Sequence, residues 1–407
     1  MLLRIIGYAL IGAAAVLVFS IPYRNSLKSQ VPLIFTPSQL LEATWLNYKN
    51  AYVEKDTFRT IDKDRHNITT SEGQSYTMLR AVWMADKLTF DGAWKWSQDN
   101  IKHQTDSLFA WEWGQLQSGG FGFITSDNGE NSASDADQAI ALSLVFAYAR
   151  WQDPSYLDSA RSIIEEIWNR EVIVVNGTPY LAADDVEKTS RSPAFVVNPS
   201  YFNPAAYRIF AQVDPSHPWS LLVKSSYAVL SQSMASNLDA TASDGLPPDW
   251  IGIDRTSGAI TSLTGTPGAD TNFGFDAMRV PFMLALDDAW FGDPQDRALL
   301  SSMTYLSQKW RGFGSIASIY GHDGGEIMSD ESSSVYGGTI GFFIVADPSD
   351  AATVYERKLL FLYNPGANEW KTPLSYYDDN WAWFGIGLYN QLLPNLAAGL
   401  PSSAFSQ

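Results

Sequence analysis

The sequence contains no cysteine, and its 407 residues include only four histidines, His66, His103, His217 and His322. Without cysteine the chain has no disulfide framework, no thiol nucleophile and no thiolate ligand for a metal. The four histidines are scattered and do not form the spacing of a zinc site. We therefore expect neither a metal nor a cofactor.

Charged side chains are also scarce, at 17% of the chain compared with about 25% in an average soluble domain. Their balance is strongly acidic, with 27 Lys and Arg against 44 Asp and Glu, a formal net charge of -17. This charge argues against nucleic acid or an anionic membrane surface as a partner. Hydrophobic residues make up 45% and aromatic residues 14% of the chain, which suits a large core and a neutral ligand.

The N-terminus carries an uncharged apolar run, residues 5–21, behind Arg4. A membrane-spanning helix needs about 20 residues, and a signal peptide needs a small-residue cleavage site, which does not follow this run. A signal peptide and an uncleaved membrane anchor therefore both remain open for residues 1–30, with residues 31–400 forming the folded domain. In either case we expect export: the protein is secreted, periplasmic or anchored at the outer face of the cell membrane.

An Asp-Pro dipeptide recurs where an apolar segment ends and a mixed segment begins. The four copies are Asp153-Pro154, Asp214-Pro215, Asp293-Pro294 and Asp347-Pro348. Asp is a good N-cap and Pro is tolerated at the first helical position, so each dipeptide predicts a helix start. Residues 139–151 are apolar almost all round, as in a buried helix, whereas residues 155–170 are apolar on one face only.

The same alternation along the chain predicts twelve helices, six inner and six outer. They cover residues 37–53, 72–87, 90–101, 139–151, 155–170, 201–213, 218–234, 276–290, 295–310, 332–346, 350–363 and 378–393. Because each outer helix returns the chain, the inner helices run parallel and their N-termini share one rim. Residues 172–193 and 245–267 are predicted as loops or short β-hairpins on that rim. The alternative is an ordinary helical bundle with irregular pairs.

Three inner helices are predicted to begin with a carboxylate: Glu72, Asp135 and Asp276. If the inner N-termini share a rim, these side chains converge on one cleft. The structural alternative is that each carboxylate only stabilises the first turn of its helix, by about 0.3–1 kcal/mol.

Capping signals predict the helix position of two of these carboxylates, Glu72 and Asp135. Ser71 and Gln74 have the spacing of a capping box, as do Ser134 and Asp137, so the residue after each serine is predicted at the first helical position. We interpret Asp137 itself as a structural residue.

Two tryptophans, Trp111 and Trp113, lie in a short loop after the third predicted helix, on the expected rim. Packing in a core is the usual role of an aromatic ring. In a loop flanked by glycine, however, these rings are candidates for stacking on sugar faces, because an aromatic body with a polar edge suits that surface.

Several segments, taken together, resemble the signature of glycoside hydrolase family 8. In chain order they are residues 70–80, 109–114, 133–151, 198–207 and 275–281. The resemblance runs from about residue 44 to residue 393 and implies an all-α (α/α)6 barrel and an inverting mechanism. The family includes bacterial endoglucanases, among them those of cellulose-synthesis operons, as well as xylanases, lichenases and chitosanases.

The resemblance also implies roles for individual residues. Glu72 matches the general acid, Asp276 matches the general base, and Asp135 matches the carboxylate that contacts and helps to distort the sugar at the cleaved bond. Tyr201 and Arg279 match residues around the base and its water. Inversion requires two carboxyl groups about 6.5–9.5 Å apart on opposite sides of the sugar.

The positive end of a helix favours a charged carboxylate, which suits a base but opposes the protonated form that an acid needs. We therefore predict that burial or a neighbouring carboxylate, with Asp135 as the candidate, raises the pKa of Glu72.

The expected function is endo-acting, inverting hydrolysis of β-1,4-glucan, with a link to bacterial cellulose synthesis and its synthase complex as a further expectation. The alternatives are hydrolysis of xylan or chitosan by the same fold, and a non-catalytic glycan-binding protein.

Overall fold

The structure is a computed structural model that describes residues 35–263, 266 and 268–405. The predicted signal peptide or anchor lies outside these residues, so its prediction stays a prediction. None of the helices within the described ranges is both long enough and apolar enough to cross a membrane. Pro37 begins the compact unit that contains every helix described below.

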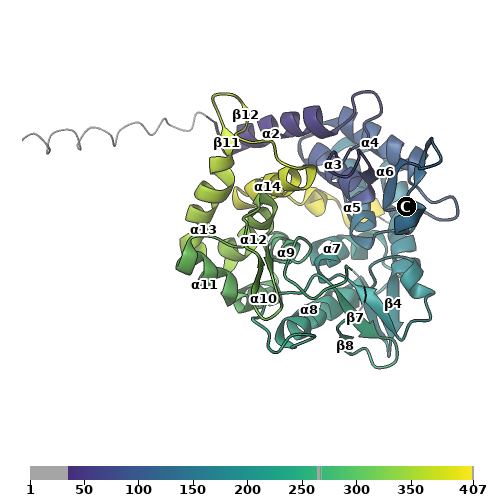
Figure 1. The fold of residues 1–407 in the computed structure, drawn as a ribbon. Coiled ribbons are helices and arrows are strands. Elements are labelled where there is room, and N and C mark those ends of the chain that lie inside the picture. The colour runs from purple at the N-terminus through teal and green to yellow at the C-terminus, as the bar shows by residue number, and fades with distance from the viewer. Residues whose placement is uncertain (1–34, 264–265, 267, 406–407) are drawn as a thin grey trace, which may run out of the picture. The chain divides into compact units, whose positions relative to one another are not determined.

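Six helices form a closed inner ring (Figure 1). They are α3 (Ser71–Trp83), α5 (Ser134–Trp151), α7 (Pro204–Val213), α9 (Arg279–Phe291), α12 (Ser333–Ala346) and α14 (Tyr376–Tyr389). Each inner helix packs against the next one, and α14 packs back against α3. This arrangement confirms the predicted inner ring and excludes an irregular bundle.

An outer helix covers each inner helix. The outer helices are α2 (Pro37–Tyr52), α4 (Lys87–Asn100), α6 (Pro154–Glu166), α8 (Trp219–Ala235), α10 (Pro294–Ser302) with α11 (Thr304–Phe313), and α13 (Pro348–Val354). The fold is therefore the all-α (α/α)6 barrel that the resemblance implied. Two outer helices are extended by further turns: π-helices at Ile167–Glu171 and Tyr355–Leu359, the second followed by a 3₁₀ turn at Leu360–Leu362.

The predictions for the helix over residues 295–310 and for the start at Asp214-Pro215 are wrong. The helix predicted over residues 295–310 is broken at Met303 into α10 and α11, so the described chain contains thirteen α-helices rather than twelve. Asp214-Pro215 does not start a helix, because Asp214 ends α7 and the next helix begins at Trp219. By contrast, Asp153 and Asp293 cap α6 and α10 as predicted, each accepting a bond from a backbone N–H.

Short antiparallel strands lie in the connections between helices. They are β1 (Thr69–Thr70), β2 (Glu112–Gln115) and β3 (Phe121–Phe123); β4 (Val172–Val175) and β5 (Thr178–Leu181); β6 (Ala194–Val197), β7 (Ile251–Asp254) and β8 (Ile260–Thr261); β9 (Ile319–Tyr320) and β10 (Glu326–Met328); and β11 (Tyr363–Asn364) and β12 (Glu369–Trp370). The predicted hairpin regions, residues 172–193 and 245–267, contain β4–β5 and β7–β8, which confirms both.

Glycines allow α12 to approach its inner neighbours closely. A Cβ at Gly337 would lie 2.0 Å from the carbonyl oxygen of Trp381 on α14, and one at Gly341 would lie 2.3 Å from that of Pro281 on α9. Because no side chain separates the backbones here, the inner ring closes tightly on this side.

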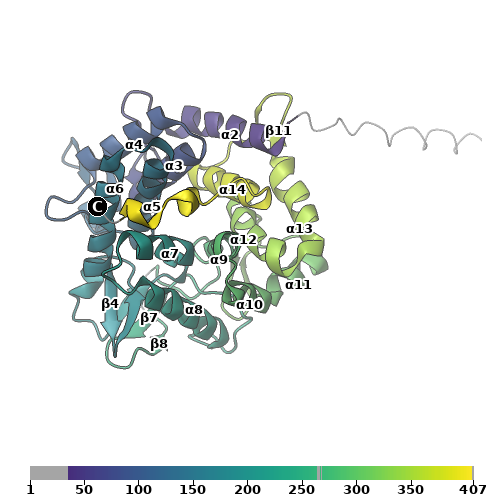
Figure 2. The same ribbon diagram turned by 180° about the vertical axis from the view of Figure 1, so that it is seen from behind.

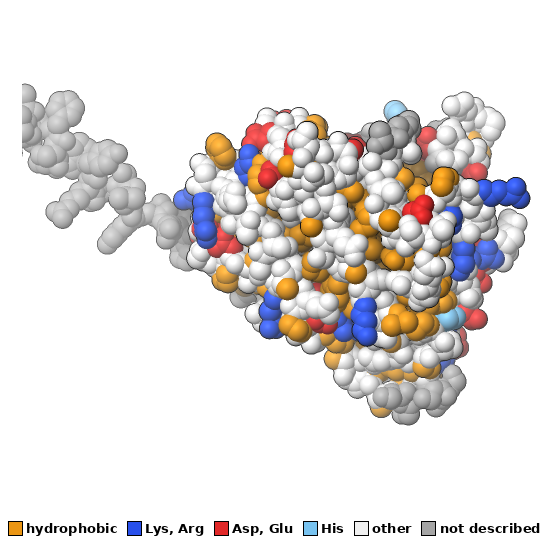
Figure 3. All heavy atoms as spheres, turned by 90° about the horizontal axis from the view of Figure 1, so that it is seen from below, with side chains coloured by type: hydrophobic (Ala, Val, Ile, Leu, Met, Phe, Trp, Pro, Cys, Tyr) orange, Lys and Arg blue, Asp and Glu red, His pale blue; other side chains and the backbone are white. Residues whose placement is uncertain are grey.

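The far end of the barrel is covered by the C-terminal segment, drawn in yellow across α5 and α7 in Figure 2. This segment includes 3₁₀ turns at Leu396–Gly399 and Ser402–Phe405. Trp83 and Trp290, near the ends of α3 and α9, donate their indole N–H groups to the carbonyl oxygens of Pro394 (3.1 Å) and Leu393 (2.8 Å). The opposite end carries the N-termini of the inner helices and the site described next. Figure 3 shows one side of the ring, where apolar side chains are mixed with scattered charges.

Candidate active site

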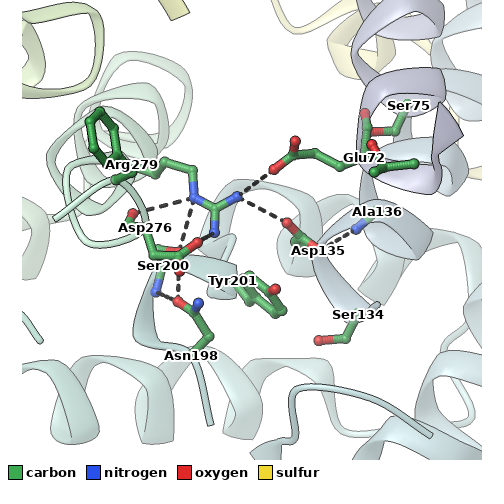
Figure 4. A network of polar contacts seen from close by, with 12 residues as sticks. Glu72, Ser75, Ser134, Asp135, Ala136, Asn198, Ser200, Tyr201, Asp276 and Arg279 are labelled. Atoms are coloured by element: carbon green, nitrogen blue, oxygen red, sulfur yellow. Dashed lines mark hydrogen bonds and ion pairs between the residues drawn. The ribbon is translucent and has the colours of Figure 1, made fainter. Parts of the chain in front are cut away.

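The centre of the site is Arg279, the first residue of α9, whose side chain is 2% exposed. Its Nη1 atom donates to Oε2 of Glu72 and to Oδ2 of Asp135, both at 3.0 Å. Its Nη2 atom donates to Oδ1 of Asp276 (Figure 4). The three carboxylates that the sequence predicts to converge are therefore held by one guanidinium group, with Glu72 and Asp276 on different nitrogen atoms.

Glu72 enters the site from the second position of α3. The N-cap is Thr70, whose side chain accepts a bond from the N–H of Gly73 at 3.0 Å, so the capping box predicted at Ser71 is wrong by one residue. The hydroxyl of Tyr376, the first residue of α14, donates to Oε1 of Glu72 at 2.5 Å. Both carboxylate oxygens of Glu72 are thus fixed by buried partners.

Asp135 enters from the second position of α5. The N-cap of this helix is Ala133, and no side chain caps it, so the second predicted capping box is wrong. One oxygen of Asp135 accepts the N–H of Ala136 at 2.8 Å while the other binds Arg279. Asp137 is structural, as predicted, but through a different contact: it accepts the N–H of Phe109 at 3.0 Å.

Asp276 lies in the turn before α9 and does not open the helix, contrary to the prediction, because α9 begins at Arg279. The turn is held by Asp249, which no sequence pattern marked as a site residue. Oδ1 of Asp249 accepts the N–H groups of Asp276 (3.2 Å) and Ala277 (2.6 Å).

Tyr201 lies in the 3₁₀ turn Pro199–Tyr201, with the guanidinium carbon of Arg279 5.1 Å from its ring centre. The neighbouring Ser200 was missed. Its hydroxyl accepts Nε (3.0 Å) and Nη2 (2.7 Å) of Arg279 and in turn donates to Oδ1 of Asn198 at 2.6 Å. Ser200 therefore fixes the guanidinium plane between the carboxylates.

Trp111 and Trp113 occupy different surroundings. The carbonyl oxygen of Trp111 accepts the N–H of Ser71, next to Glu72, at 3.0 Å, and its half-buried indole donates to the carbonyl of Asn128 at 3.0 Å. Trp113 packs edge-on against Trp96, with ring centres 5.1 Å apart.

The ring of Phe121 stacks on that of Trp113 with ring centres 5.1 Å apart, and Phe121 itself is 60% exposed. The outer surface of this stack is therefore Phe121 rather than Trp113. Trp111 remains the better candidate of the two tryptophans for contact with a sugar.

A cavity of about 50 Å³ continues from the site toward the barrel centre. Asp135, Tyr201 and Arg279 lie on its wall, together with apolar side chains from later turns of the inner helices. The lining is largely apolar, which keeps bulk water away from the inner side of the carboxylates and strengthens their electrostatic interactions.

Burial raises the pKa of Glu72 to about 7. The positive charge of Arg279 and the hydroxyl of Tyr376 oppose this shift, while the charges of Asp135 and Asp276 add to it. Burial also raises the pKa of Asp135, again against the effect of Arg279. Both causes that the sequence analysis offered for a raised pKa of Glu72, burial and Asp135, act here, and burial is the larger.

One group of side chains outside this site brings ligand atoms together in the described part of the chain. His103, Asp106 and Asp185 place one ligand atom each within 4.8 Å of one another. Asp106 is already engaged there, since its Oδ1 pairs with Nδ1 of His103 (2.9 Å) and accepts the N–H of Leu108 (3.0 Å). A structural role accounts for these contacts.

Comparison with known families gives a match to the model described as "Glycosyl hydrolases family 8" over residues 20–369. The chain belongs to glycosyl hydrolases family 8. Within this family it is 30% identical over 265 residues to Endoglucanase 2 of Ruminiclostridium josui, covering 63% of this chain and 51% of that protein. It is also 30% identical over 217 residues to an endoglucanase of Escherichia coli K12, covering 53% and 55% of the two chains.

The chain thus spans about half the length of these curated relatives. Among solved structures, the endo-1,4-D-glucanase of Vibrio fischeri ES114 matches with a TM-score of 0.71 at 25% identity, covering 85% of this chain and 94% of that one. An inverting mechanism is general to family 8, in agreement with the expectation from the sequence.

Proposed function

We propose that the protein is an endo-acting, inverting glycoside hydrolase that cleaves β-1,4-glucan. The observation that carries the proposal is the attachment of Glu72 and Asp276 to different nitrogens of the buried Arg279. An inverting hydrolase needs two carboxyl groups at a set separation on opposite sides of the sugar, because one must protonate the leaving oxygen and the other must activate water. Attachment to two nitrogens of one rigid guanidinium group fixes the separation of Glu72 and Asp276.

Glu72 is proposed as the general acid. Its pKa of about 7 keeps a large fraction protonated at neutral pH, which an acid at this site requires. The hydroxyl of Tyr376 and Nη1 of Arg279 hold its two oxygens in place, so the proton is presented in a fixed direction.

Asp276 is proposed as the base that accepts a proton from the attacking water. It is 30% exposed, more than Glu72 at 21% and Asp135 at 15%, so it is the most accessible of the three carboxylates to water. Asp135, between the two, is proposed to contact the sugar at the cleaved bond.

A β-1,4-glucan is proposed as the substrate because charged residues make up only 17% of the chain and aromatic residues 14%, which suits a neutral polymer. The two relatives and the structural neighbour named above are endoglucanases by name, which supports the same choice. Xylan and chitosan are the competing substrates, and chitosan is favoured only by the net charge of -17.

The test is a reducing-sugar assay of the purified full-length chain on carboxymethylcellulose, xylan and chitosan, with viscosity followed in parallel. We expect release of reducing sugar from carboxymethylcellulose with an early fall in viscosity, because endo action cuts chains in their interior. Faster turnover of xylan or chitosan would identify that polymer as the substrate instead. No turnover of any of the three polymers would favour the alternative of a non-catalytic glycan-binding protein.

Replacement of the two proposed catalytic residues tests their roles. Glu72→Gln and Asp276→Asn are each expected to lower kcat by about 10²–10⁴-fold, the usual contribution of a positioned acid or base. The matched control is Glu165→Gln, whose exposed side chain lies on the outer helix α6 and is expected to leave kcat unchanged. Wild-type turnover by either site variant would reject the assigned roles.

We also propose that the protein is exported, supported by the apolar run at residues 5–21. Cell fractionation with antibody detection tests this, and recovery of the protein only in the cytosol would contradict it. The link to a cellulose synthase complex rests on the family resemblance and stays a prediction.

A further inference from the structure

The turn that carries Asp276 is held by a buried carboxylate from another part of the chain, Asp249. Its Oδ1 atom accepts the backbone N–H groups of Gly274 (3.2 Å), Asp276 (3.2 Å) and Ala277 (2.6 Å). The backbone N–H of Asp249 also donates to the carbonyl of Asn272 at 2.6 Å. Both the main chain and the side chain of Asp249, which is 9% exposed, are thus tied to the segment that leads into α9.

The turn has little room to move against this carboxylate. A Cβ at Gly274 would lie 2.5 Å from Oδ2 of Asp249, so the backbone and the carboxylate are in direct contact. Two residues on, Asp276 binds Nη2 of Arg279 through its side chain and the N–H of Arg279 through its carbonyl oxygen. A turn that left Asp249 would therefore move Asp276 away from Arg279.

The contact can form in either protonation state of Asp249. Burial raises the pKa of Asp249, the charge of Asp276 acts in the same direction, and the backbone N–H groups of the turn oppose the shift. The other charged groups around this pair are Arg279, Asp135, Glu72 and Asp270. A carboxyl in either protonation state keeps an oxygen that accepts hydrogen bonds, so Oδ1 can hold the turn in both.

We propose that Asp249 is a positioning residue for the reaction: by gathering three N–H groups of the turn on one oxygen, it sets where Asp276 stands relative to Arg279 and the attacking water. The proposal rests on the proposed role of Asp276 as base. Displacement of a reacting group by about 1 Å can cost 10²-fold in rate, so the effect falls on kcat rather than on sugar binding.

The experiment compares Asp249→Ala, Asp249→Asn and a control in the full-length protein. The control is Asp254→Ala, because Asp254 accepts the N–H groups of Thr256 (3.0 Å) and Ser257 (2.7 Å) in the turn between β7 and β8 but contacts none of the site carboxylates. Asp249→Ala is expected to lower kcat on carboxymethylcellulose about 100-fold with KM changed less than about threefold. Asp249→Asn keeps an acceptor oxygen and is expected to lose less than about tenfold, and Asp254→Ala should match the wild type.

A second readout separates positioning of the base from general loss of structure. Aryl cellotriosides with a dinitrophenyl leaving group need little help from an acid, whereas those with a phenyl leaving group need it. Glu72→Gln should therefore regain much of its rate on the dinitrophenyl substrate. The rate of Asp249→Ala should fall by the same factor on both substrates. The variant displaces the base that activates water and leaves the acid in place.

The inference is overturned if Asp249→Ala keeps a kcat within about threefold of the wild type, if its loss disappears on the dinitrophenyl substrate, or if Asp249→Asn is as slow as Asp249→Ala. Should Asp249→Ala fail to fold, Gly274→Ala displaces the same turn from the other side and is expected to show the same selective loss of kcat. A wild-type protein without hydrolytic activity would instead reject the proposed function, so the two failures are distinguishable.

Discussion

The raised pKa of Glu72 has a consequence for stability that is independent of any substrate. A carboxyl whose pKa is higher in the folded protein than in the unfolded chain releases its proton more readily on unfolding. Raising the pH from below 4.5 to above 7 therefore favours the unfolded chain, and the loss of stability is complete once the pH exceeds the folded pKa.

The size of the effect follows from the two pKa values. Glu72 shifts from an ordinary 4.5 to about 7. One pKa unit corresponds to about 1.36 kcal/mol, so ionised Glu72 costs the folded protein about 3 kcal/mol above pH 7. Because 21% of the side chain is exposed, solvent screening reduces this figure, and about 2 kcal/mol is a fair expectation.

The perturbation is Glu72→Gln, and the assay is urea unfolding of wild type and variant at pH 5 and at pH 8. Titrating groups that do not interact with Glu72 are common to both proteins and cancel in the difference. The stability of Glu72→Gln relative to the wild type should rise by about 1–1.5 kcal/mol between pH 5 and pH 8, because the carboxyl of the unfolded chain is already largely ionised at pH 5. The exposed-site control Glu165→Gln should show no such rise. A difference that stays constant, or that falls with pH, would refute the burial argument for Glu72.

Three further predictions concern activity and packing. The value of kcat/KM should fall tenfold per pH unit above about pH 7, as Glu72 loses its proton, and a pH–rate profile that stays flat to pH 9 would contradict the acid assignment. Arg279→Met should lower the free energy of unfolding by about 3–5 kcal/mol at pH 8 and by less at pH 5, because protonated Glu72 does not repel Asp135 and Asp276. Urea unfolding measures this, and equal losses at both pH values would be inconsistent with it. Trp111→Ala should raise KM for cellohexaose with Tm nearly unchanged. Trp113→Ala should lower Tm, because Trp113 packs against Trp96 and Phe121. The reverse pattern in thermal melts and kinetics would show that Trp113 binds the sugar and Trp111 stabilises the fold.

The ring of helices could be predicted from the sequence because the alternation of buried and one-sided helices is local information. The break at Met303 could not, since neither glycine nor proline marks it: the residue before it is Ser302 and the one after it is Thr304. The turn there is closed by backbone bonds from Met303 to Leu300 and from Leu306 to Met303, which any sequence can make.

The one-residue errors at the helix starts have causes that lie far along the chain. Thr70 is paired with Glu112 across β1 and β2, so it is extended and takes the N-cap position that Ser71 could equally have filled. Ser134 donates its hydroxyl to the carbonyl of Ala182 at 2.7 Å, so it does not cap its own helix.

The candidate site shows the same division between local and distant information. Its carboxylates were predicted because each lies near the start of a predicted inner helix, and Arg279 was predicted because its segment carries the family pattern. Asp249 and Tyr376 were missed because they reach the site from 27 and 304 residues away in sequence, counted to Asp276 and Glu72. No local pattern marks either of them. The closed ring brings Tyr376 to the site, and the connection between α8 and β7 brings Asp249.

The account depends most on a water molecule activated by Asp276 attacking the sugar from the side opposite Glu72. Proton NMR of the first product released from a soluble β-1,4-glucan oligosaccharide tests this most directly, because an attack from the opposite side inverts the anomeric carbon. The account predicts that the α-anomer appears first and the β-anomer accumulates only through mutarotation. Initial release of the β-anomer would contradict it.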